Sequence, residues 1–186
     1  MLLLASCAST NIKKYYADNK LALDNISQTY REQNAKGSFS ILFTDKSFKH
    51  VSIEIATDTI KYIYEFELNE KRLGDTLIKY HLPVNETEGL ITAMKAIKCS
   101  WISNLDYYED EKKGSLVFMS IRSKSFNIPL VDKKYYILTY YAQPQYYDSE
   151  GRLLDRKKRR RLRRINKDIF YRINDKVCYT VSNLFR

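Results

Sequence analysis

The chain has 186 residues, of which 44% are hydrophobic and 13% aromatic, and its formal net charge at pH 7 is +10. This length fits one domain with a sizeable core, and the apolar content excludes a generally disordered protein. No run of about 18 or more apolar residues occurs, so a membrane-spanning helix is excluded as well.

The first residues carry the clearest indication of location. Leu4-Ala5-Ser6-Cys7 places an aliphatic residue and two small residues before a cysteine. This run resembles the end of a bacterial lipoprotein signal, and the resemblance implies that the Cys7 thiol accepts a diacylglycerol and that the signal before it is cut away. The protein would then be lipid-anchored in the cell envelope. Ala8 stands where an aspartate would favour the inner membrane, so the resemblance favours the outer membrane, with the domain facing the periplasm.

This interpretation divides the chain into three parts. Residues 1–7 are the remainder of the signal with the lipidation site, residues 8–17 are a tether, and residues 18–186 form a single domain. The domain is expected to begin with a short helix from about Asp18, the N-cap, to Asn34.

A section of strands is expected next, at 38–43, 50–55, 60–68 and 76–81. The run from 60 to 68 is the clearest, because large apolar residues alternate there with mostly polar ones, as in a sheet with one buried face. Short polar turns separate these segments, which favours an antiparallel meander.

A central helix is predicted near residues 86–106, with Asn85 as its N-cap. Its apolar residues step along the chain by three or four positions, at Leu90, Met94, Ile97, Trp101 and Leu105. Three more strands are expected after it, at about 116–122, 126–130 and 135–142, with a hairpin turn at 132–134.

The final segment has helical periodicity, because apolar residues recur every three or four positions. These residues are Leu162, Ile165, Ile169, Ile173, Val177, Val181 and Phe185. One helix is therefore predicted over about 153–184, with a possible break at Asn174-Asp175. Together the elements predict an α+β fold: an antiparallel β-meander, the central helix near 86–106, and a long C-terminal helix packed on the sheet.

Most of the net charge lies in one segment of nine residues, Arg156–Arg164, which we call the basic segment. Without its eight cations the formal net charge falls from +10 to +2. The cations are Arg156, Lys157, Lys158, Arg159, Arg160, Arg161, Arg163 and Arg164. Because so many like charges repel one another, we expect an anionic partner. For a lipid-anchored protein this is an anionic lipid, a cell-wall polymer or an acidic protein surface. For a cytosolic protein it is nucleic acid.

Catalysis and metal binding find little support in the sequence. The two histidines, His50 and His81, are expected in strands and lack nearby partners for a metal site or a catalytic triad. The carboxylates Glu65/Glu67 and Glu109–Glu111 are interpreted as solvated surface rather than as a glycosidase pair. We therefore expect no catalytic residue, no metal and no cofactor.

Two further features leave alternatives open. Cys99 and Cys178 would form an even pair in an oxidising compartment, either as a disulfide or as two buried free thiols. The sixteen tyrosines, many of them adjacent, either fill half-buried strand positions or form an exposed row that stacks on planar ligands such as sugars.

The sequence thus favours a lipid-anchored envelope protein that acts as a non-catalytic binding or assembly component through its basic helix. The first alternative is a cytosolic nucleic-acid-binding protein that uses Arg156–Arg164. The second alternative is an envelope sugar-binding protein or enzyme built around the tyrosines.

Overall fold

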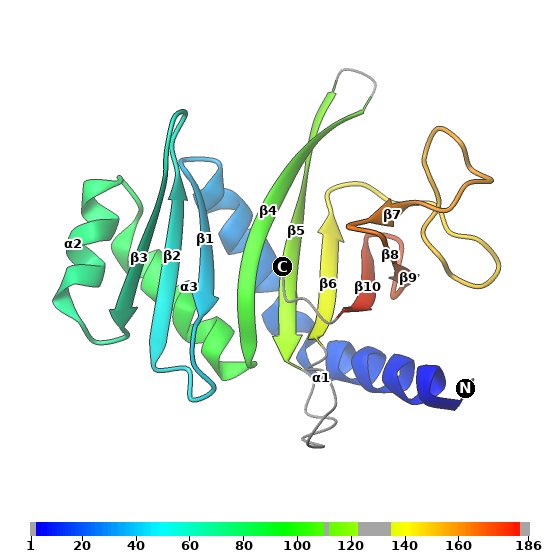
Figure 1. The fold of residues 1–186 in the computed structure, drawn as a ribbon, viewed down its shortest axis with the longest axis horizontal. Coiled ribbons are helices and arrows are strands. Elements are labelled where there is room, and N and C mark those ends of the chain that lie inside the picture. The colour runs from blue at the N-terminus through cyan, green and yellow to red at the C-terminus, as the bar shows by residue number, and fades with distance from the viewer. Residues whose placement is uncertain (1–2, 110–111, 123–134, 183–186) are drawn as a thin grey trace. The chain divides into compact units, whose positions relative to one another are not determined.

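The computed structural model describes residues 3–109, 112–122 and 135–182, and the chain divides into two compact units. One unit holds residues 19–104, and the other holds residues 1–18 and 105–186. Helix α1 (Leu3–Asn34) and strand β4 (Cys99–Glu109) each contribute to both units (Figure 1). Within the described ranges, none of the helices combines the length and the apolar composition needed to cross a membrane.

The unit of residues 19–104 is built on an antiparallel sheet. β1 (Ser38–Phe43), β2 (His50–Ala56) and β3 (Lys61–Glu67) follow one another as a meander, and the start of β4 pairs with the free side of β1. These strands confirm the predicted meander between residues 38 and 68. β1 and β2 bury their alternating apolar residues, whereas β3, at the edge of the sheet, buries only Phe66.

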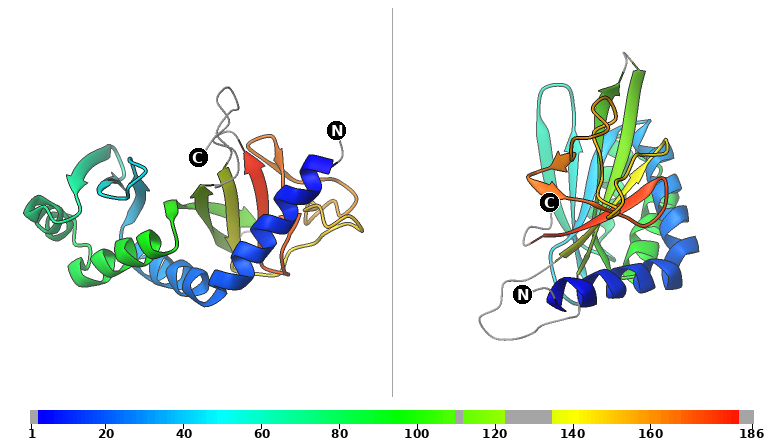
Figure 2. Two further views of the ribbon diagram at one scale, coloured as in Figure 1. Left: turned by 90° about the horizontal axis from the view of Figure 1, so that it is seen from below. Right: turned by 90° about the vertical axis from the view of Figure 1, so that its right-hand side faces the viewer.

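Helices cover one face of this sheet. Figure 2 shows α3 (Val84–Ala96) beside the C-terminal half of α1, and the Thr87 hydroxyl of α3 donates to Gln33 Oε1 of α1 at 3.1 Å. Tyr30 of α1 is fully buried, donates its hydroxyl to the carbonyl of Phe39 on β1, and meets the Phe39 ring edge-on at 5.2 Å. The short helix α2 (Lys71–Lys79) packs through its own buried leucines.

The other unit contains β5 (Lys112–Arg122), β6 (Tyr135–Tyr141), β9 (Tyr171–Arg172) and β10 (Val177–Ser182), which are antiparallel in the order β5-β6-β10-β9. A separate hairpin is formed by β7 (Arg164–Ile165) and β8 (Asp168–Ile169). One buried cluster holds these strands and the following loops together. Its members are Leu116, Ile137, Tyr141, Leu153, Phe170 and Cys178.

Hydrogen bonds join eight strands in the order β3-β2-β1-β4-β5-β6-β10-β9, and every described pairing is antiparallel. The prediction of an α+β fold with a long C-terminal helix over 153–184 is therefore wrong. Within the described residues the structure is mostly antiparallel sheet with three helices, and the chain from residue 164 to 182 forms the strands β7 to β10.

Local backbone preferences explain why no helix forms there. Asn166 and Lys167 both adopt positive φ angles, 51° and 70°, which is the geometry of a two-residue hairpin turn between β7 and β8. Asn174 makes a second turn, since its side-chain oxygen accepts the backbone N–H groups of Lys176 and Val177. The apolar residues between these turns are either β-branched (Ile169 and Ile173) or aromatic (Phe170 and Tyr171), and both kinds suit strands better than a helix.

Two other predicted elements change in the structure. The central helix α3 ends at Ala96, and Lys98 then adopts a positive φ of 60° that turns the chain into β4, so the predicted range 86–106 is part helix and part strand. The segment predicted as a strand at 76–81 lies largely in α2, where Leu73 and Leu77 are buried one helical turn apart. The predicted strand at 126–130 and the turn at 132–134 lie outside the described residues.

The beginning of the chain also differs from the expectation. Residues 8–17, expected to be a tether, lie within α1, which reaches back to Leu3. Ile12 and Tyr16 are buried, and the Asn174 side chain donates to the Tyr16 hydroxyl at 3.0 Å. The backbone of Cys7 is part of the same helix.

Candidate anion-binding site

The basic segment is an ordered loop rather than a helix, and its two ends are joined. Leu154 forms a β-bridge with Leu162, and the backbone N–H of Arg163 donates to the carbonyl of Leu153 at 2.9 Å. Leu153 itself is fully buried and donates its N–H to the carbonyl of Phe170 at 2.8 Å. The loop therefore emerges from the buried cluster of its unit, and that cluster determines where it begins and ends.

Asp155 shapes the turn at the start of this loop. Its Oδ1 accepts the backbone N–H groups of Lys157 at 2.9 Å and Lys158 at 3.0 Å, and its own N–H donates to the carbonyl of Arg161 at 2.8 Å. The N–H of Lys158 lowers the pKa of the Asp155 carboxyl, against the opposing effect of desolvation, and the nearby charge of Arg163 adds to the lowering. The carboxylate thus remains ionised and keeps the turn closed at neutral pH.

Two arginines of the basic segment lie against tyrosine rings. The Arg159 guanidinium is 4.2 Å from the centre of the Tyr146 ring, and its Nη2 donates to the Tyr146 hydroxyl at 3.1 Å. The Arg163 guanidinium lies 5.6 Å from the Tyr107 ring and 5.7 Å from the Tyr141 ring. Such cation–π contacts stabilise a charged group without neutralising it. They fix the positions of the two side chains and leave their charge in place.

A third arginine is held by an amide. Arg156 Nη1 donates to Gln143 Oε1 at 2.8 Å, so this guanidinium also has a polar partner that carries no charge. Because tyrosine and glutamine do not compensate the positive charge, these contacts give the loop order but do not lower its electrostatic potential.

Four of the exposed cations of the loop have no ion pair among the described residues. All five residues from Lys157 to Arg161 are exposed, and they line an open hollow of about 590 Å3. In the part of the chain that the structure describes, Lys158, Arg159, Arg160 and Arg161 make no ion pair. Oδ1 of the nearby Asp155 already accepts two backbone N–H groups, and the charges of Arg163 and Arg161 lie close enough to lower the pKa of this carboxyl. The loop is thus a preorganised cationic surface that phosphate or carboxylate groups can approach.

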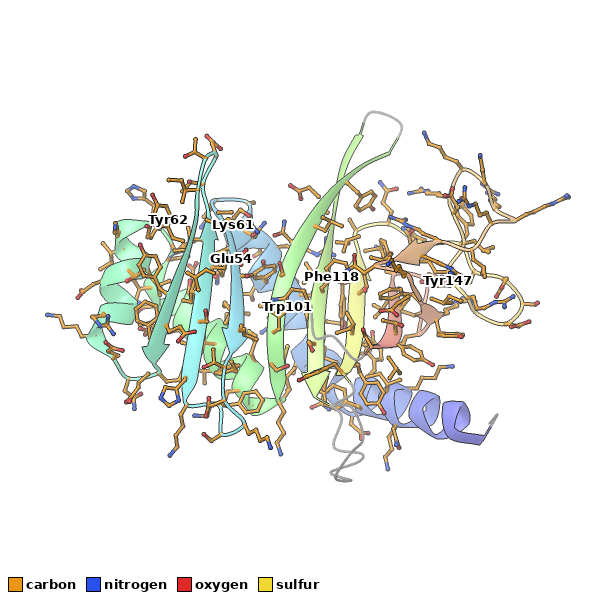
Figure 3. All side chains as sticks on the ribbon, in the orientation of Figure 1. Glu54, Lys61, Tyr62, Trp101, Phe118 and Tyr147 are labelled. Carbon is orange, nitrogen blue, oxygen red and sulfur yellow. The ribbon has the colours of Figure 1, made fainter. Side chains whose placement is uncertain are left out.

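Figure 3 shows the long side chains of this loop spreading into solvent beyond β7 and β8, with Tyr147 at its base. Tyr147 packs against the buried cluster and supports the Arg172 guanidinium at 5.6 Å from its ring. Arg172 in turn makes an ion pair with Asp175 at 2.6 Å. This neighbouring arginine is therefore compensated, unlike the four exposed cations of the loop.

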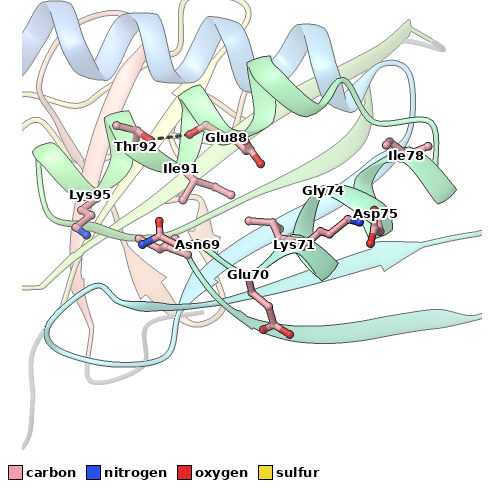
Figure 4. Close-up of a pocket in the computed structure, with 12 residues that line it drawn as sticks. Asn69, Glu70, Lys71, Gly74, Asp75, Ile78, Glu88, Ile91, Thr92 and Lys95 are labelled. Carbon is pink, nitrogen blue, oxygen red and sulfur yellow. Dashed lines mark hydrogen bonds between the residues drawn. The ribbon is translucent and has the colours of Figure 1, made fainter.

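A groove of about 790 Å3 between α2 and α3 is a second hollow in the structure (Figure 4). Leu73 and Ile91 form its buried apolar wall, while Lys71, Lys95 and Glu88 lie around it. Charges of both signs line this groove, so it does not select anions or cations. We therefore assign the candidate site to the basic segment.

The other residues that the sequence singled out are not brought together into a site. His50, the exposed first residue of β2, lies at 3.9 Å from Asp45 and 3.8 Å from Glu67, and His81 lies in the turn after α2 rather than in a strand. Among the described residues, no three His, Cys, Asp or Glu side chains gather as a metal site requires. Glu65 is exposed on β3, and residues 110–111 of the acidic loop lie outside the described residues.

The cysteines and tyrosines are largely internal. Cys99 and Cys178 are free thiols and completely buried, and burial raises the pKa of each thiol to about 12. Tyr136, Tyr140 and Tyr141 on β6 are buried too, so this strand does not display the exposed aromatic row that sugar stacking would need.

The cations of the candidate site are evident in the sequence, but the groups that hold them are not. Tyr146 and Gln143 are close to the basic segment in sequence, yet their roles depend on the turn at Asp155. Tyr107 and Tyr141 reach Arg163 only through the pairing of distant strands. The one available signal was Asp155 followed by a polar run, which is typical of an Asx-turn.

Comparison of the chain with protein-family models, with curated proteins and with solved structures found no match.

Proposed function

We propose that this protein is a non-catalytic, anion-binding component of a bacterial cell envelope. In this proposal a lipid on Cys7 anchors the chain, and the basic segment contacts an anionic surface. The single observation that supports the binding role is the ordered loop at Lys157–Arg161, in which the exposed cations of Lys158, Arg159, Arg160 and Arg161 make no ion pair among the described residues. Preorganisation favours binding because the loop does not have to be ordered when the partner arrives.

An anionic lipid surface is the partner that fits this arrangement best. The exposed cations follow one another along the tip of a loop, so several of them can approach a flat surface together. Each cation close to an anionic membrane contributes about 1 kcal/mol to binding. A diacylglycerol on Cys7 supplies two acyl chains, and a polybasic contact with an anionic surface would add to that anchor.

The binding role is tested with vesicles. Full-length protein carrying Cys7→Ser, which separates the loop from the lipid anchor, is sedimented with vesicles of phosphatidylcholine alone or mixed with phosphatidylglycerol. We expect binding only to the anionic vesicles, and a steep loss of binding as the salt concentration rises. Changing the five residues Lys157–Arg161 to glutamine is expected to weaken binding to the anionic vesicles by about 5 kcal/mol. This corresponds to a decrease of the partition coefficient by between three and four orders of magnitude.

The matched control removes the same charge elsewhere. Glutamine at five exposed lysines of the other unit gives the same net charge, with the basic segment intact; these are Lys46, Lys49, Lys71, Lys95 and Lys98. This variant is expected to retain most of the binding. Equal losses in the two variants would mean that only net charge matters and would overturn the assignment of the site. Binding to duplex DNA in preference to anionic vesicles would favour the nucleic-acid alternative instead.

The anchor is tested separately by metabolic labelling with a fatty-acid analogue in the native host. Label on the wild type that is absent from Cys7→Ser, with the wild type in the membrane fraction, is the expected result. An unlabelled, soluble wild-type protein would refute the envelope location.

A further inference from the structure

The outermost strand of the sheet, β3, leaves one side of its backbone without a strand. β2 is the only strand to which it is hydrogen-bonded among the residues that the structure describes. Apolar side chains are exposed along it, since Ile63 is 63% exposed, Ile60 52% and Tyr62 36%. An edge strand that exposes apolar residues is a site where another strand can be added.

The two faces of β3 are defined by its pairing with β2. Tyr62 and Tyr64 lie opposite the buried residues Ile55 and Ile53, so the tyrosines point to the face that the helices cover. Lys61, Ile63 and Glu65 alternate with them and therefore point to the other face. Each face of the strand thus has its own set of side chains to offer to a neighbour.

The sequence Lys61-Tyr62-Ile63-Tyr64-Glu65 is complementary to itself when it is read in the opposite direction. In an antiparallel pair of two identical strands centred on Ile63, Lys61 lies opposite Glu65 of the second copy, and Tyr62 lies opposite Tyr64. Ile63 lies opposite its own equivalent. Every pair joins side chains of matching kind or opposite charge, and such cross-strand pairs stabilise a sheet.

Neighbouring registers lack this match. Centring the pair on Tyr64 places Ile63 opposite Glu65, and centring it on Tyr62 places Lys61 opposite Ile63. Both registers oppose an aliphatic side chain to a charge. The register centred on Ile63 is thus the one in which charge, aromatic and aliphatic positions all agree.

The existing contacts of Lys61 are compatible with this register. Its Nζ lies 2.8 Å from Glu54 Oε1 on β2, and its side chain remains 69% exposed (Figure 3). A carboxylate of the second copy would approach from the free side of β3, opposite to β2. The ammonium group, with three donors, can serve both carboxylates.

We propose that β3 is a self-association surface, through which two copies of this chain form a two-fold dimer with antiparallel β3 strands centred on Ile63. The dimer joins the two sheets edge to edge and pairs the free backbone groups of both β3 strands. It is carried by a different unit from the basic segment and does not rest on the proposed anion-binding function.

Charge exchange tests the register. In sedimentation equilibrium of the full chain carrying Cys7→Ser, from micromolar to millimolar concentration, we expect a monomer–dimer equilibrium. Lys61→Glu places two carboxylates opposite each other at both ends of the pair, and Glu65→Lys does the same with two ammonium groups. Each variant alone is expected to raise the dissociation constant at least tenfold. An equimolar mixture of the two is expected to dimerise again, because every opposing pair in the heterodimer is then of opposite charge.

Cross-linking provides a second readout. Cα atoms directly opposite each other in an antiparallel pair are about 4.5–5.5 Å apart, within the range that a disulfide spans. Ile63→Cys is therefore expected to form a covalent dimer on mild oxidation. Glu67→Cys is the matched control, since two residues at position 67 would be about 26 Å apart in this register.

The proposal is overturned by a wild-type chain that stays monomeric up to millimolar concentration. It is also overturned by a dimer that persists in both charge variants, or by a mixture that associates no better than its components. Cross-linking through Glu67→Cys in preference to Ile63→Cys would contradict the register. None of these outcomes bears on anion binding, so the two proposals fail independently.

Discussion

The role of Asp155 can be tested with two substitutions that differ in a single property. Asp155→Asn and Asp155→Ala remove the same negative charge from beside the basic segment. Only asparagine keeps a side-chain oxygen that can accept the N–H groups of Lys157 and Lys158, now bonded at 2.9 and 3.0 Å. The pair therefore separates the effect of charge from the effect of the turn.

The expected magnitudes follow from these contacts. Removing the carboxylate favours approach to an anionic surface by about 1 kcal/mol in both variants. Losing the acceptor loosens the turn, and comparable losses of a capping side chain cost about 1 kcal/mol. Asp155→Asn should thus bind anionic vesicles about fivefold more tightly than the wild type, and Asp155→Ala about as tightly as the wild type.

Vesicle partition at low ionic strength measures these differences, and hydrogen exchange at the amides of Lys157 and Lys158 reports on the turn itself. Exchange is expected to accelerate in Asp155→Ala and to change little in Asp155→Asn. If the two variants bind equally while exchange differs between them, the order of the loop contributes nothing to binding. That result would refute the argument from preorganisation and leave only the charge.

Three further predictions concern stability. Burial opposes ionisation of Asp45, but hydrogen bonds from Ser47 and from the backbone outweigh it and lower its pKa to about 2. Because this pKa is 3.8 in the unfolded chain and the carboxylate is screened by solvent, urea unfolding should show about 1 kcal/mol of stability that is present above pH 4.5 and lost by pH 2. An Asp45→Asn variant with the same acid-induced loss would contradict this. In the Cys7→Ser protein, the buried thiols of Cys99 and Cys178 should not react with a thiol reagent in the folded state, and two thiols per chain should react after denaturation. If no thiol reacts after denaturation, the two cysteines form a disulfide. Leu153→Ala should lower the free energy of unfolding by about 2–5 kcal/mol, because it leaves a cavity in the buried cluster. A loss under about 1 kcal/mol would show that the surrounding side chains move in and fill this cavity.

The strands that alternate in polarity were predictable from the sequence, and the first three support this point. Residues 38–43, 50–55 and 60–68 correspond to β1, β2 and β3, and in β1 and β2 the alternating apolar residues are buried. The strands at 116–122 and 135–142 correspond to β5 and β6. In each case the local pattern and the tertiary environment favour the same element.

Errors arose where a spacing of three or four residues did not come from a helix. Ile165 and Ile169 are four positions apart because they lie on the two strands of a tight hairpin, whose turn residues are Asn166 and Lys167. Neither turn residue is glycine, so the usual signal for positive φ was missing. The basic segment was identified by composition alone, but its shape depends on long-range pairing that no local pattern records.

The arginine and tyrosine contents of this chain are connected by the geometry of the loop. In a helix, residues three and four apart lie side by side, so the basic segment would bring its cations together along the axis. In the loop, Arg159 turns onto Tyr146, and Arg163 turns onto Tyr107 and Tyr141. A tyrosine ring supports a guanidinium without neutralising it, and each contact contributes about 0.5–1 kcal/mol at an exposed site.

These contacts explain how a self-repelling segment keeps one conformation and a high potential at once. Ion pairs would also order the loop, but they would cancel the charge that an anionic partner recognises. Burial raises the pKa of the Tyr141 phenol, so this supporting ring stays neutral. A surface that must remain both ordered and positive therefore needs neutral partners for its arginines, and here tyrosines provide most of them.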